Sequence, residues 1–279
     1  MNITPPITGH TRLVAHVGLP TAPFRSPMIY NPFFAARGVD AVVVPMGCRE
    51  EDWAAFLPLL LRLSNVVGAL VAMPHKVATA RLVDRASPAV AVAGACNAVR
   101  LGPDGALEGE QFDGAGMARA LADSGARLAG ASALVVGAGG AGRPIAAALA
   151  AAGVAHLVVS DVRAAAADAL AASLARHFPG LVVAAGPPEP EGHAVVVNAT
   201  PLGMAPGDPL PVDPARIAPG TAVGDVVLES ETPLVAAARA RGCRVANGMD
   251  MLFAQIPAYL DWFGLPAATP GELRALTVT

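Results

Sequence analysis

Short apolar runs alternate with stretches of helical periodicity along nearly the whole chain. Val-rich runs without polar alternation are typical of parallel strands that are buried on both faces. In the first part of the chain the pattern predicts strands at 13–18, 40–46, 66–73 and 92–101, and helices at 27–37, 50–63 and 75–85. Ser26 is expected to cap the first helix, with Pro27 at its first position. The alternation indicates an α/β layer architecture.

The alternation continues after residue 109. The expected strands are 132–136, 155–160, 194–198, 222–227 and 243–246, with helices at 143–152, 163–177 and 232–241 between them. Such a series predicts a doubly wound sheet, and a last apolar helix at 249–263 is expected to return to the first part of the chain. We therefore expect two domains, one formed by 1–108 and 247–279 and the other by 109–246.

The segment 137–142 reads Gly-Ala-Gly-Gly-Ala-Gly and lies between an expected strand and an expected helix. In this context the first glycine permits a tight turn, the second lets the backbone approach a pyrophosphate, and the third lets the helix pack on the strand. The helix N-terminus offers free N–H groups to phosphates. The second domain is thus expected to be a Rossmann domain, with cofactor-binding residues Gly137, Ala138, Gly139, Gly140, Ala141 and Gly142.

Asp161 stands at the end of the next expected strand, 24 positions after Gly137. An acidic residue about 20 positions on accepts hydrogen bonds from the adenosine ribose hydroxyls and repels the extra phosphate of NADP. The sequence therefore favours NAD over NADP as cofactor. Arg163 is also a candidate cofactor-binding residue, because a nearby arginine can contact a 2′-phosphate.

Composition excludes several classes of protein. Apolar residues make up 54% of the 279 and charged residues 15%, which is the opposite of a disordered chain. The net charge of −3 and the lack of a basic block argue against nucleic-acid or anionic membrane partners. No transmembrane helix or signal peptide is expected. The three cysteines lie far apart, without a CxxC motif, so we expect no metal site and a reducing, cytoplasmic location.

One residue stands out in the count of basic side chains. Of the 19 basic residues, 18 are arginine and only Lys76 is lysine. Arginine is effectively always protonated, whereas a partly buried lysine can lose its proton. Lys76 is therefore a candidate for proton-transfer chemistry, at the junction of an expected strand and helix. Asp113 lies at the start of the segment that links the two expected domains. A cleft between the domains is expected to hold both the Lys76 and the Asp113 side chains.

Several segments together resemble the shikimate dehydrogenase family, in the same order and over about 13–260. They are 17–20 with 26–27, Pro74-His75-Lys76, Gly94-Ala95-Cys96-Asn97-Ala98-Val99, Phe112-Asp113-Gly114-Ala115-Gly116, the glycine loop, Asn198-Ala199-Thr200-Pro201-Leu202-Gly203-Met204 and Met251-Leu252-Phe253-Ala254-Gln255. The resemblance implies an NAD(P)-dependent oxidoreductase with a substrate domain and a Rossmann domain. Such an enzyme interconverts a ring alcohol and a ketone on a cyclic hydroxy acid such as shikimate or quinate.

The resemblance also implies roles for individual residues. Lys76 and Asp113 match the catalytic pair at the reacting hydroxyl. The expected substrate-binding residues are Ser26, Asn97 and Gln255, and further cofactor-binding residues are Asn198, Thr200 and Gly248. No metal is implied, and the chain is expected to be a monomer or a homodimer. His75 neighbours the lysine, but we expect it to be a capping or packing residue rather than the base.

The sequence departs from the family pattern at positions that would touch substrate. Phe24 replaces the first serine of a Ser-x-Ser pair, and Leu70 and Ala72 stand where Asn and Thr are usual. Further departures are Gln111-Phe112, Leu228 and Asp250. Each lost polar contact is worth roughly 0.5–1.5 kcal/mol. We therefore expect a related, less polar hydroxy compound as substrate, unless Arg25 replaces the missing serine as a carboxylate partner.

Two other functions fit parts of the sequence. A non-catalytic NAD-binding sensor or partner module would explain the thinned substrate pocket, but it has no need for Lys76. Another Rossmann dehydrogenase, such as a folate-linked or amino-acid enzyme, would not explain the spacing of Asn97, Asp113 and Gln255.

Overall fold

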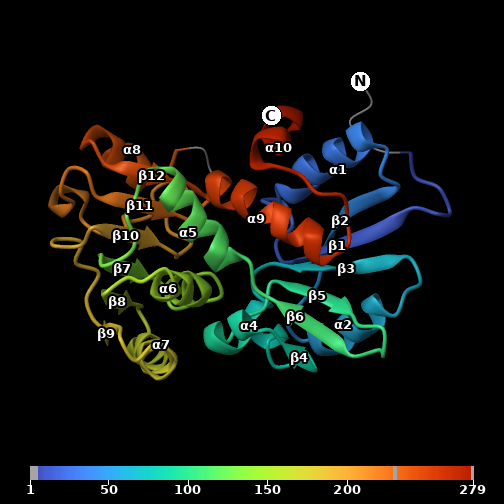
Figure 1. Cartoon of the computed structure of the whole chain (residues 1–279), viewed down its shortest axis with the longest axis horizontal. Helices are drawn as coiled ribbons and strands as arrows, with labels where there is room; N and C mark the ends of the chain where they lie inside the picture. The colour runs from blue at the N-terminus through green and yellow to red at the C-terminus, as the bar shows by residue number, and fades with distance from the viewer. Residues whose placement is uncertain (1–5, 229–230, 278–279) are drawn as a thin grey trace. The chain divides into compact units, whose positions relative to one another are not determined.

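The computed structural model describes residues 6–228 and 231–277 and divides them into two compact units. The first unit comprises residues up to Ala91, Ala95–Phe112 and Ile256 onward; the second comprises Val92–Gly94 and Asp113–Gln255. The second division falls inside helix α9 (Gly248–Trp262), so Gln255 is the last residue of the second unit. Each unit contains one six-stranded sheet, which confirms the α/β prediction (Figure 1).

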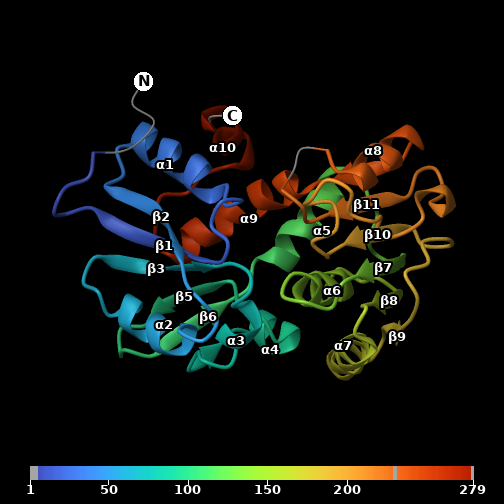
Figure 2. The same ribbon diagram turned by 180° about the vertical axis from the view of Figure 1, so that it is seen from behind.

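The sheet of the first unit has the strand order β2-β1-β3-β5-β6-β4 (Figures 1 and 2). Its strands are β1 (Arg12–Gly18), β2 (Ala41–Gly47), β3 (Val66–Val71), β4 (Arg85–Ala86), β5 (Ala98–Leu101) and β6 (Leu107–Glu110). Strand β1 pairs in parallel with β2 and β3, whereas β5 runs antiparallel to both of its neighbours. Gly105, with φ of +83°, lies in the turn between β5 and β6.

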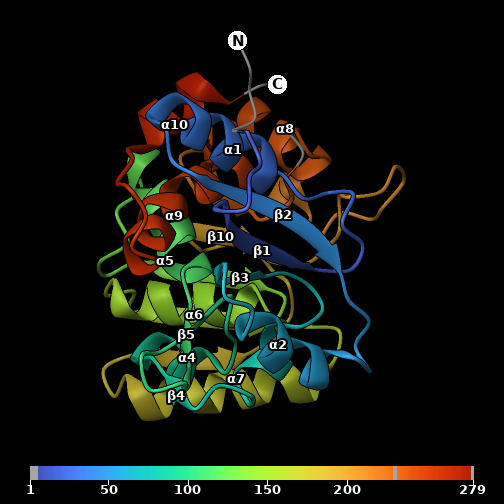
Figure 3. The same ribbon diagram turned by 90° about the vertical axis from the view of Figure 1, so that its right-hand side faces the viewer.

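Helices cover both faces of this sheet. They are α1 (Ser26–Arg37), α2 (Trp53–Leu61), α3 (Lys76–Thr79), α4 (Pro88–Ala93, at the boundary between the units) and α10 (Pro270–Leu276). The α2 side chains Trp53 and Leu57 pack in one apolar cluster with Val17 and Val71 of the central strands. Helix α10 lies against α1 (Figure 3), where Arg37 and Glu272 form an ion pair.

Three expectations for this unit are wrong. The helix expected at 75–85 covers only Lys76–Thr79, and Arg85 at its end belongs to strand β4. Residues 92–101 are not one strand: α4 ends in this stretch, Gly94 turns the chain with φ of +62°, and only β5 is extended. The sequence signal for helix α4 lies at its start, where the Ser87 hydroxyl accepts the Val90 N–H and Pro88 is the first helical residue. Ser26 is not the helix cap either, because Arg25 holds that position and Ser26 is the first helical residue.

The second unit is a doubly wound parallel sheet with the order β12-β11-β10-β7-β8-β9. Its strands are β7 (Ser132–Val136), β8 (His156–Ser160), β9 (Val182–Ala185), β10 (Val195–Asn198), β11 (Ala222–Asp225) and β12 (Arg244–Ala246). Its helices are α5 (Asp113–Asp123), α6 (Gly142–Ala151), α7 (Ala164–His177) and α8 (Pro233–Ala240), with a short 3₁₀ turn at Pro214–Arg216 and the first part of α9.

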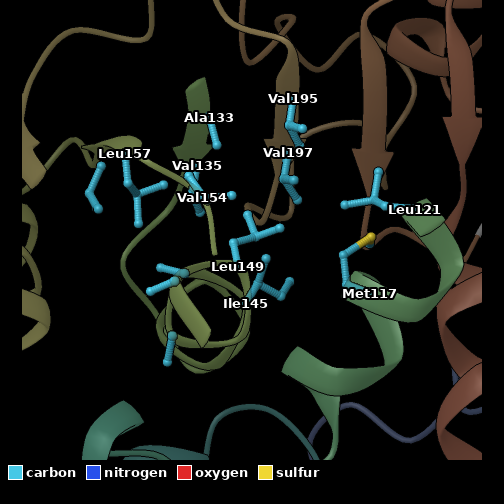
Figure 4. Close-up of a cluster of buried hydrophobic side chains, with 14 of the residues drawn as sticks. Met117, Leu121, Ala133, Val135, Ile145, Leu149, Val154, Leu157, Val195 and Val197 are labelled. Atoms are coloured by element: carbon cyan, nitrogen blue, oxygen red, sulfur yellow. The ribbon is translucent and has the colours of Figure 1, made fainter. Parts of the chain in front are cut away.

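The central strands β7, β10 and β11 are buried on both faces, as the uninterrupted apolar runs predicted, whereas the edge strand β9 is partly exposed. Ala133 and Val135 of β7 face the cluster that contains α5, α6 and α7, whereas Leu134 faces the cluster that contains α8. Figure 4 shows Ile145 and Leu149 of α6 beside Val135 in the first of these clusters. This packing fixes α6 directly after β7, which positions the glycine loop.

Candidate functional site

The glycine loop connects β7 to α6 and has the geometry that its sequence predicts. Gly137 has φ of +108°, and a Cβ there would lie 2.7 Å from the Ala199 carbonyl oxygen. A Cβ on Gly142 would lie 1.7 Å from the Gly137 carbonyl oxygen, so only glycine fits at the start of α6. Above Gly139 there is open space, with no atom within 4 Å of a built Cβ. The loop can therefore admit a diphosphate against its backbone at the N-terminus of α6.

Substituting these glycines separates folding from cofactor binding. We expect Gly142→Ala to destabilise the protein, because the new methyl overlaps the loop backbone, and to lower the melting temperature by about 6–12 °C with loss of cofactor binding. Gly139→Ala has room in the fold and should keep the melting temperature while weakening cofactor binding. Gly180→Ala, also in open space, is the control.

Thermal unfolding of each variant with and without cofactor measures both effects. Wild-type stability and cofactor binding in Gly142→Ala would contradict the expectation.

Asp161 follows β8 and is tied to the glycine loop. Its Oδ2 accepts the Ala138 N–H at 2.7 Å, and its Oδ1 accepts the Arg163 N–H at 2.9 Å. Burial disfavours the charged form, but these hydrogen bonds and the Arg163 guanidinium outweigh it, so the pKa of Asp161 lies below its usual value. The carboxylate is therefore ionised at neutral pH. The Arg163 side chain is 70% exposed and pairs with this carboxylate at 3.3 Å.

Arg143 was not singled out in the sequence, although it directly follows the last glycine of the loop. Its Nε donates to the Ala138 carbonyl at 3.0 Å. The hydrogen bond holds the Arg143 guanidinium, through its Nε, against the glycine loop at the N-terminus of α6. A positive charge there suits a diphosphate. The sequence feature that could have identified Arg143 is its position in the first turn of the helix expected to bind phosphate.

Asn198 and Thr200 shape the loop after β10 through hydrogen bonds within the protein. The Asn198 amide donates to Asp225 Oδ1 at 3.0 Å and to the Leu202 carbonyl, and its Oδ1 accepts the Thr200 hydroxyl at 2.6 Å. Burial raises the pKa of Asp225, against the lowering effect of its hydrogen bonds. This network positions Ala199, whose carbonyl packs against Gly137. The two side chains thus act on the glycine loop by holding the neighbouring loop in place.

Gly248 begins α9 at a site where no larger residue fits. A Cβ there would lie 2.3 Å from the Val227 carbonyl oxygen. The close approach keeps the first turn of α9 against the backbone that follows β11. Gly248 is therefore required by backbone packing within the second unit.

Asp113 and Gln255 are brought to neighbouring parts of the second unit by two close helix contacts. Asp113 is the first residue of α5 and is only 3% exposed. A Cβ on Gly114 would lie 2.1 Å from the Pro144 carbonyl oxygen, so the start of α5 packs on the start of α6. A Cβ on Gly116, two residues later, would lie 3.0 Å from the Gln255 Cβ. Asp113 therefore lies near both the helix that the glycine loop begins and the substrate-binding candidate Gln255.

Lys76 is the first residue of α3 in the first unit and is partly buried. Its backbone carbonyl accepts the Cys96 N–H at 2.8 Å, so the segment lies beside Asn97. The preceding His75 is buried, stacks on Trp53 and has Nε2 3.0 Å from the Cys48 carbonyl. This arrangement confirms that His75 is a packing residue.

Buried polar atoms without a partner mark two of the expected substrate-binding residues. Asn97 is fully buried; its Oδ1 accepts the Phe112 N–H at 2.9 Å, but its Nδ2 has no partner. Gln255 is 7% exposed, and its Oε1 has no partner. Leaving such an atom unsatisfied costs roughly 1–3 kcal/mol, so these amides are suited to a polar ligand.

The segment before Ser26 places an aromatic ring against strand β1. Ser26 is buried at the start of α1, with the partly buried Arg25 before it. The Phe24 ring stacks on the His16 ring of β1, with centroids 3.9 Å apart and planes at 15°. His16 was not singled out in the sequence. The signal was a histidine inside an otherwise apolar strand, two residues before Gly18.

The described residues contain neither a metal-binding cluster nor a membrane-spanning helix. No group of three or more His, Cys, Asp or Glu side chains in this part of the chain is arranged to hold a metal ion. No helix among the same residues has the length and hydropathy needed to cross a bilayer.

Comparisons with known proteins agree with one another. The family model for the shikimate dehydrogenase substrate binding domain matches residues 17–99. The shikimate dehydrogenase (NADP+) of Acidiphilium cryptum is 40% identical over 276 residues, covering 97% of each chain.

Solved structures of similar proteins also match over nearly the full length of the chain. The shikimate 5-dehydrogenase of Listeria monocytogenes, in complex with shikimate and NAD, is 26% identical and matches with a TM-score of 0.86, covering 99% of each chain. The quinate dehydrogenase of Corynebacterium glutamicum, in complex with NAD, is 29% identical and matches with a TM-score of 0.82, covering 95% of this chain and 98% of that one.

Proposed function

Because the chain belongs to the shikimate dehydrogenase family and is an oxidoreductase of the alcohol dehydrogenase class, we propose that it interconverts a ring alcohol and a ketone of a cyclic hydroxy acid. Shikimate, quinate and closely related compounds are the candidate substrates. The observation that carries this proposal is the pair of buried, unsatisfied amide atoms, Asn97 Nδ2 and Gln255 Oε1. They offer one donor and one acceptor to ring hydroxyls.

In the proposed mechanism Lys76 and Asp113 form the proton-transfer pair. For alcohol oxidation, neutral Lys76 Nζ removes the hydroxyl proton; for ketone reduction, the ammonium returns it. Asp113 accepts a hydrogen bond from Lys76 or from the substrate hydroxyl and so orients both. When bound, the nicotinamide cofactor accepts or supplies the hydride. Ser26 is proposed to bind the substrate carboxylate.

The residues of the second unit fit a dinucleotide. The glycine loop and the N-terminus of α6 would hold the diphosphate, with Arg143 beside them. We propose that Asp161 accepts hydrogen bonds from the adenosine ribose, so that NAD is preferred, even though the Acidiphilium relative is named for NADP+. Its ionised carboxylate supports this preference, since a 2′-phosphate at that position would meet a like charge. Asn198, Thr200 and Gly248 are proposed to contact the cofactor as well as to keep the adjoining loops in position.

We further propose that the physiological substrate is less polar than shikimate or presents different groups to the first unit. Phe24 occupies the position of a hydroxyl residue, and Leu70 and Ala72 add none. Three lost hydrogen bonds, each worth roughly 0.5–1.5 kcal/mol, weaken binding by one to three orders of magnitude.

Steady-state assays of the purified protein test both parts of the proposal. We expect cofactor-dependent turnover of at least one cyclic hydroxy acid, with NAD preferred to NADP. For shikimate we expect a kcat/KM below about 10⁵ M⁻¹s⁻¹, and a higher value for another ring acid such as quinate. A shikimate kcat/KM at or above that value contradicts the altered substrate. Absence of turnover across shikimate, quinate and related acids with either cofactor contradicts the proposed activity.

A further inference from the structure

Among the described residues, three buried side-chain atoms have no hydrogen-bond partner, and two of them belong to proposed substrate ligands. The atoms are Asn97 Nδ2, Gln255 Oε1 and His16 Nδ1. Buried polar groups in native proteins are nearly always satisfied, so each exception requires an explanation. For Asn97 and Gln255 the proposed function supplies the explanation, since a substrate hydroxyl would pair with each atom. His16 shows the same signature and has no role in the proposed mechanism.

His16 lies in the part of the first unit that carries the proposed substrate residues. The sheet register places His16 of β1 beside Leu70 of β3, and Leu70 beside Ala98 of β5, the neighbour of Asn97. Lys76 follows β3 and is close enough for its charge to act on the imidazole. His16 therefore belongs to the same group of side chains as Asn97 and Lys76.

The contact between Phe24 and His16 makes His16 a candidate for substrate specificity. Its ring stacks on His16 and also packs over Gly18, where a Cβ would lie 2.9 Å from the Phe24 Cζ. The stacked pair replaces hydroxyl surface with two aromatic rings and leaves one polar atom, Nδ1, with an unused hydrogen bond.

We propose that His16 is a substrate-contacting, specificity-determining residue whose Nδ1 hydrogen-bonds an uncharged oxygen, a hydroxyl or a ring carbonyl, of the substrate. This inference rests on the proposed function and deepens it. The chain then favours a substrate that presents a hydroxyl or a carbonyl, rather than its carboxylate, to His16 Nδ1.

The charge state of His16 supports an uncharged partner. Burial and the neighbouring Lys76 charge lower the pKa of His16 to about 3. The imidazole is therefore neutral at physiological pH and offers no positive charge to a carboxylate. A neutral ring nitrogen instead suits a hydroxyl or a carbonyl.

The test compares His16→Leu, which removes the nitrogen, with His16→Asn, whose amide reaches about as far as Nδ1. With the best substrate found for the wild-type protein, we expect His16→Leu to raise the substrate KM by about 3- to 10-fold, with kcat and the cofactor KM within about twofold of wild type. His16→Asn should recover most of the substrate KM. The melting temperature of His16→Leu should not fall, because an unsatisfied buried atom has been removed.

The control is His193→Leu, because His193 is a partly buried histidine of the second unit that already bonds the Ser132 hydroxyl through Nδ1. It should leave the substrate KM unchanged. An unchanged KM in His16→Leu, or a lower melting temperature with no recovery in His16→Asn, would show a packing role and overturn the inference while leaving the proposed function intact. If the wild-type protein turns over no ring hydroxy acid, the proposed function fails first and this inference fails with it.

Discussion

Replacing Lys76 by alanine is expected to lower kcat by about 10²–10⁴-fold, the usual contribution of general acid–base catalysis. Lys76→Arg should be almost as inactive, because a guanidinium does not give up its proton at the pH of the reaction. Cofactor binding should persist in both variants, since the glycine loop and Asp161 belong to the second unit. Steady-state kinetics and cofactor titration of the same preparations measure the two effects.

Arg81→Ala is the matched control for this experiment, because Arg81 is an exposed cation just after α3. It should retain wild-type kcat. Wild-type turnover in Lys76→Arg would remove the lysine from the mechanism. A wild-type protein that binds NAD without turnover would instead favour the non-catalytic sensor.

Replacing Asp161 by asparagine is expected to shift cofactor preference toward NADP. The ratio of kcat/KM for NAD to kcat/KM for NADP should fall by about 100-fold. Removing the charge relieves repulsion of a 2′-phosphate, worth about 1–4 kcal/mol at 4 Å, and weakens the bond to the ribose of NAD. The asparagine oxygen can still accept one of the backbone N–H groups that Asp161 holds, Ala138 or Arg163. Much of the loop geometry is therefore retained.

Asp168→Asn removes an equally negative but exposed side chain from α7 and is the control for this substitution. The ratio should be unchanged in this variant. A wild-type enzyme that already prefers NADP, or an Asp161→Asn variant with the wild-type ratio, would contradict the assignment of Asp161.

The strands and the glycine loop could be predicted from sequence because each depends on the residue types within one short segment. Val195–Asn198 is apolar up to its last residue since both faces of β10 are buried, and Gly142 is glycine since its Cβ has no space. The stretch 92–101 was mispredicted because apolar content alone does not separate a short capped helix from a strand.

The site could be predicted only in part, because two of its features depend on packing between distant segments. The unsatisfied state of Asn97 Nδ2 depends on which N–H its other amide atom accepts, and that partner is Phe112, 15 residues later. The stack of His16 on Phe24 joins a strand to a loop. Neither contact has a periodic signature in the sequence.

The most direct test of the account is a crystal structure of the protein with NAD and a cyclic hydroxy acid. We predict that Lys76 Nζ lies within about 3 Å of the reacting hydroxyl, with the Asp113 carboxylate at hydrogen-bond distance from the same group. A structure in which the substrate is bound but Lys76 points into bulk water, away from the hydroxyl and from Asp113, would contradict the central claim.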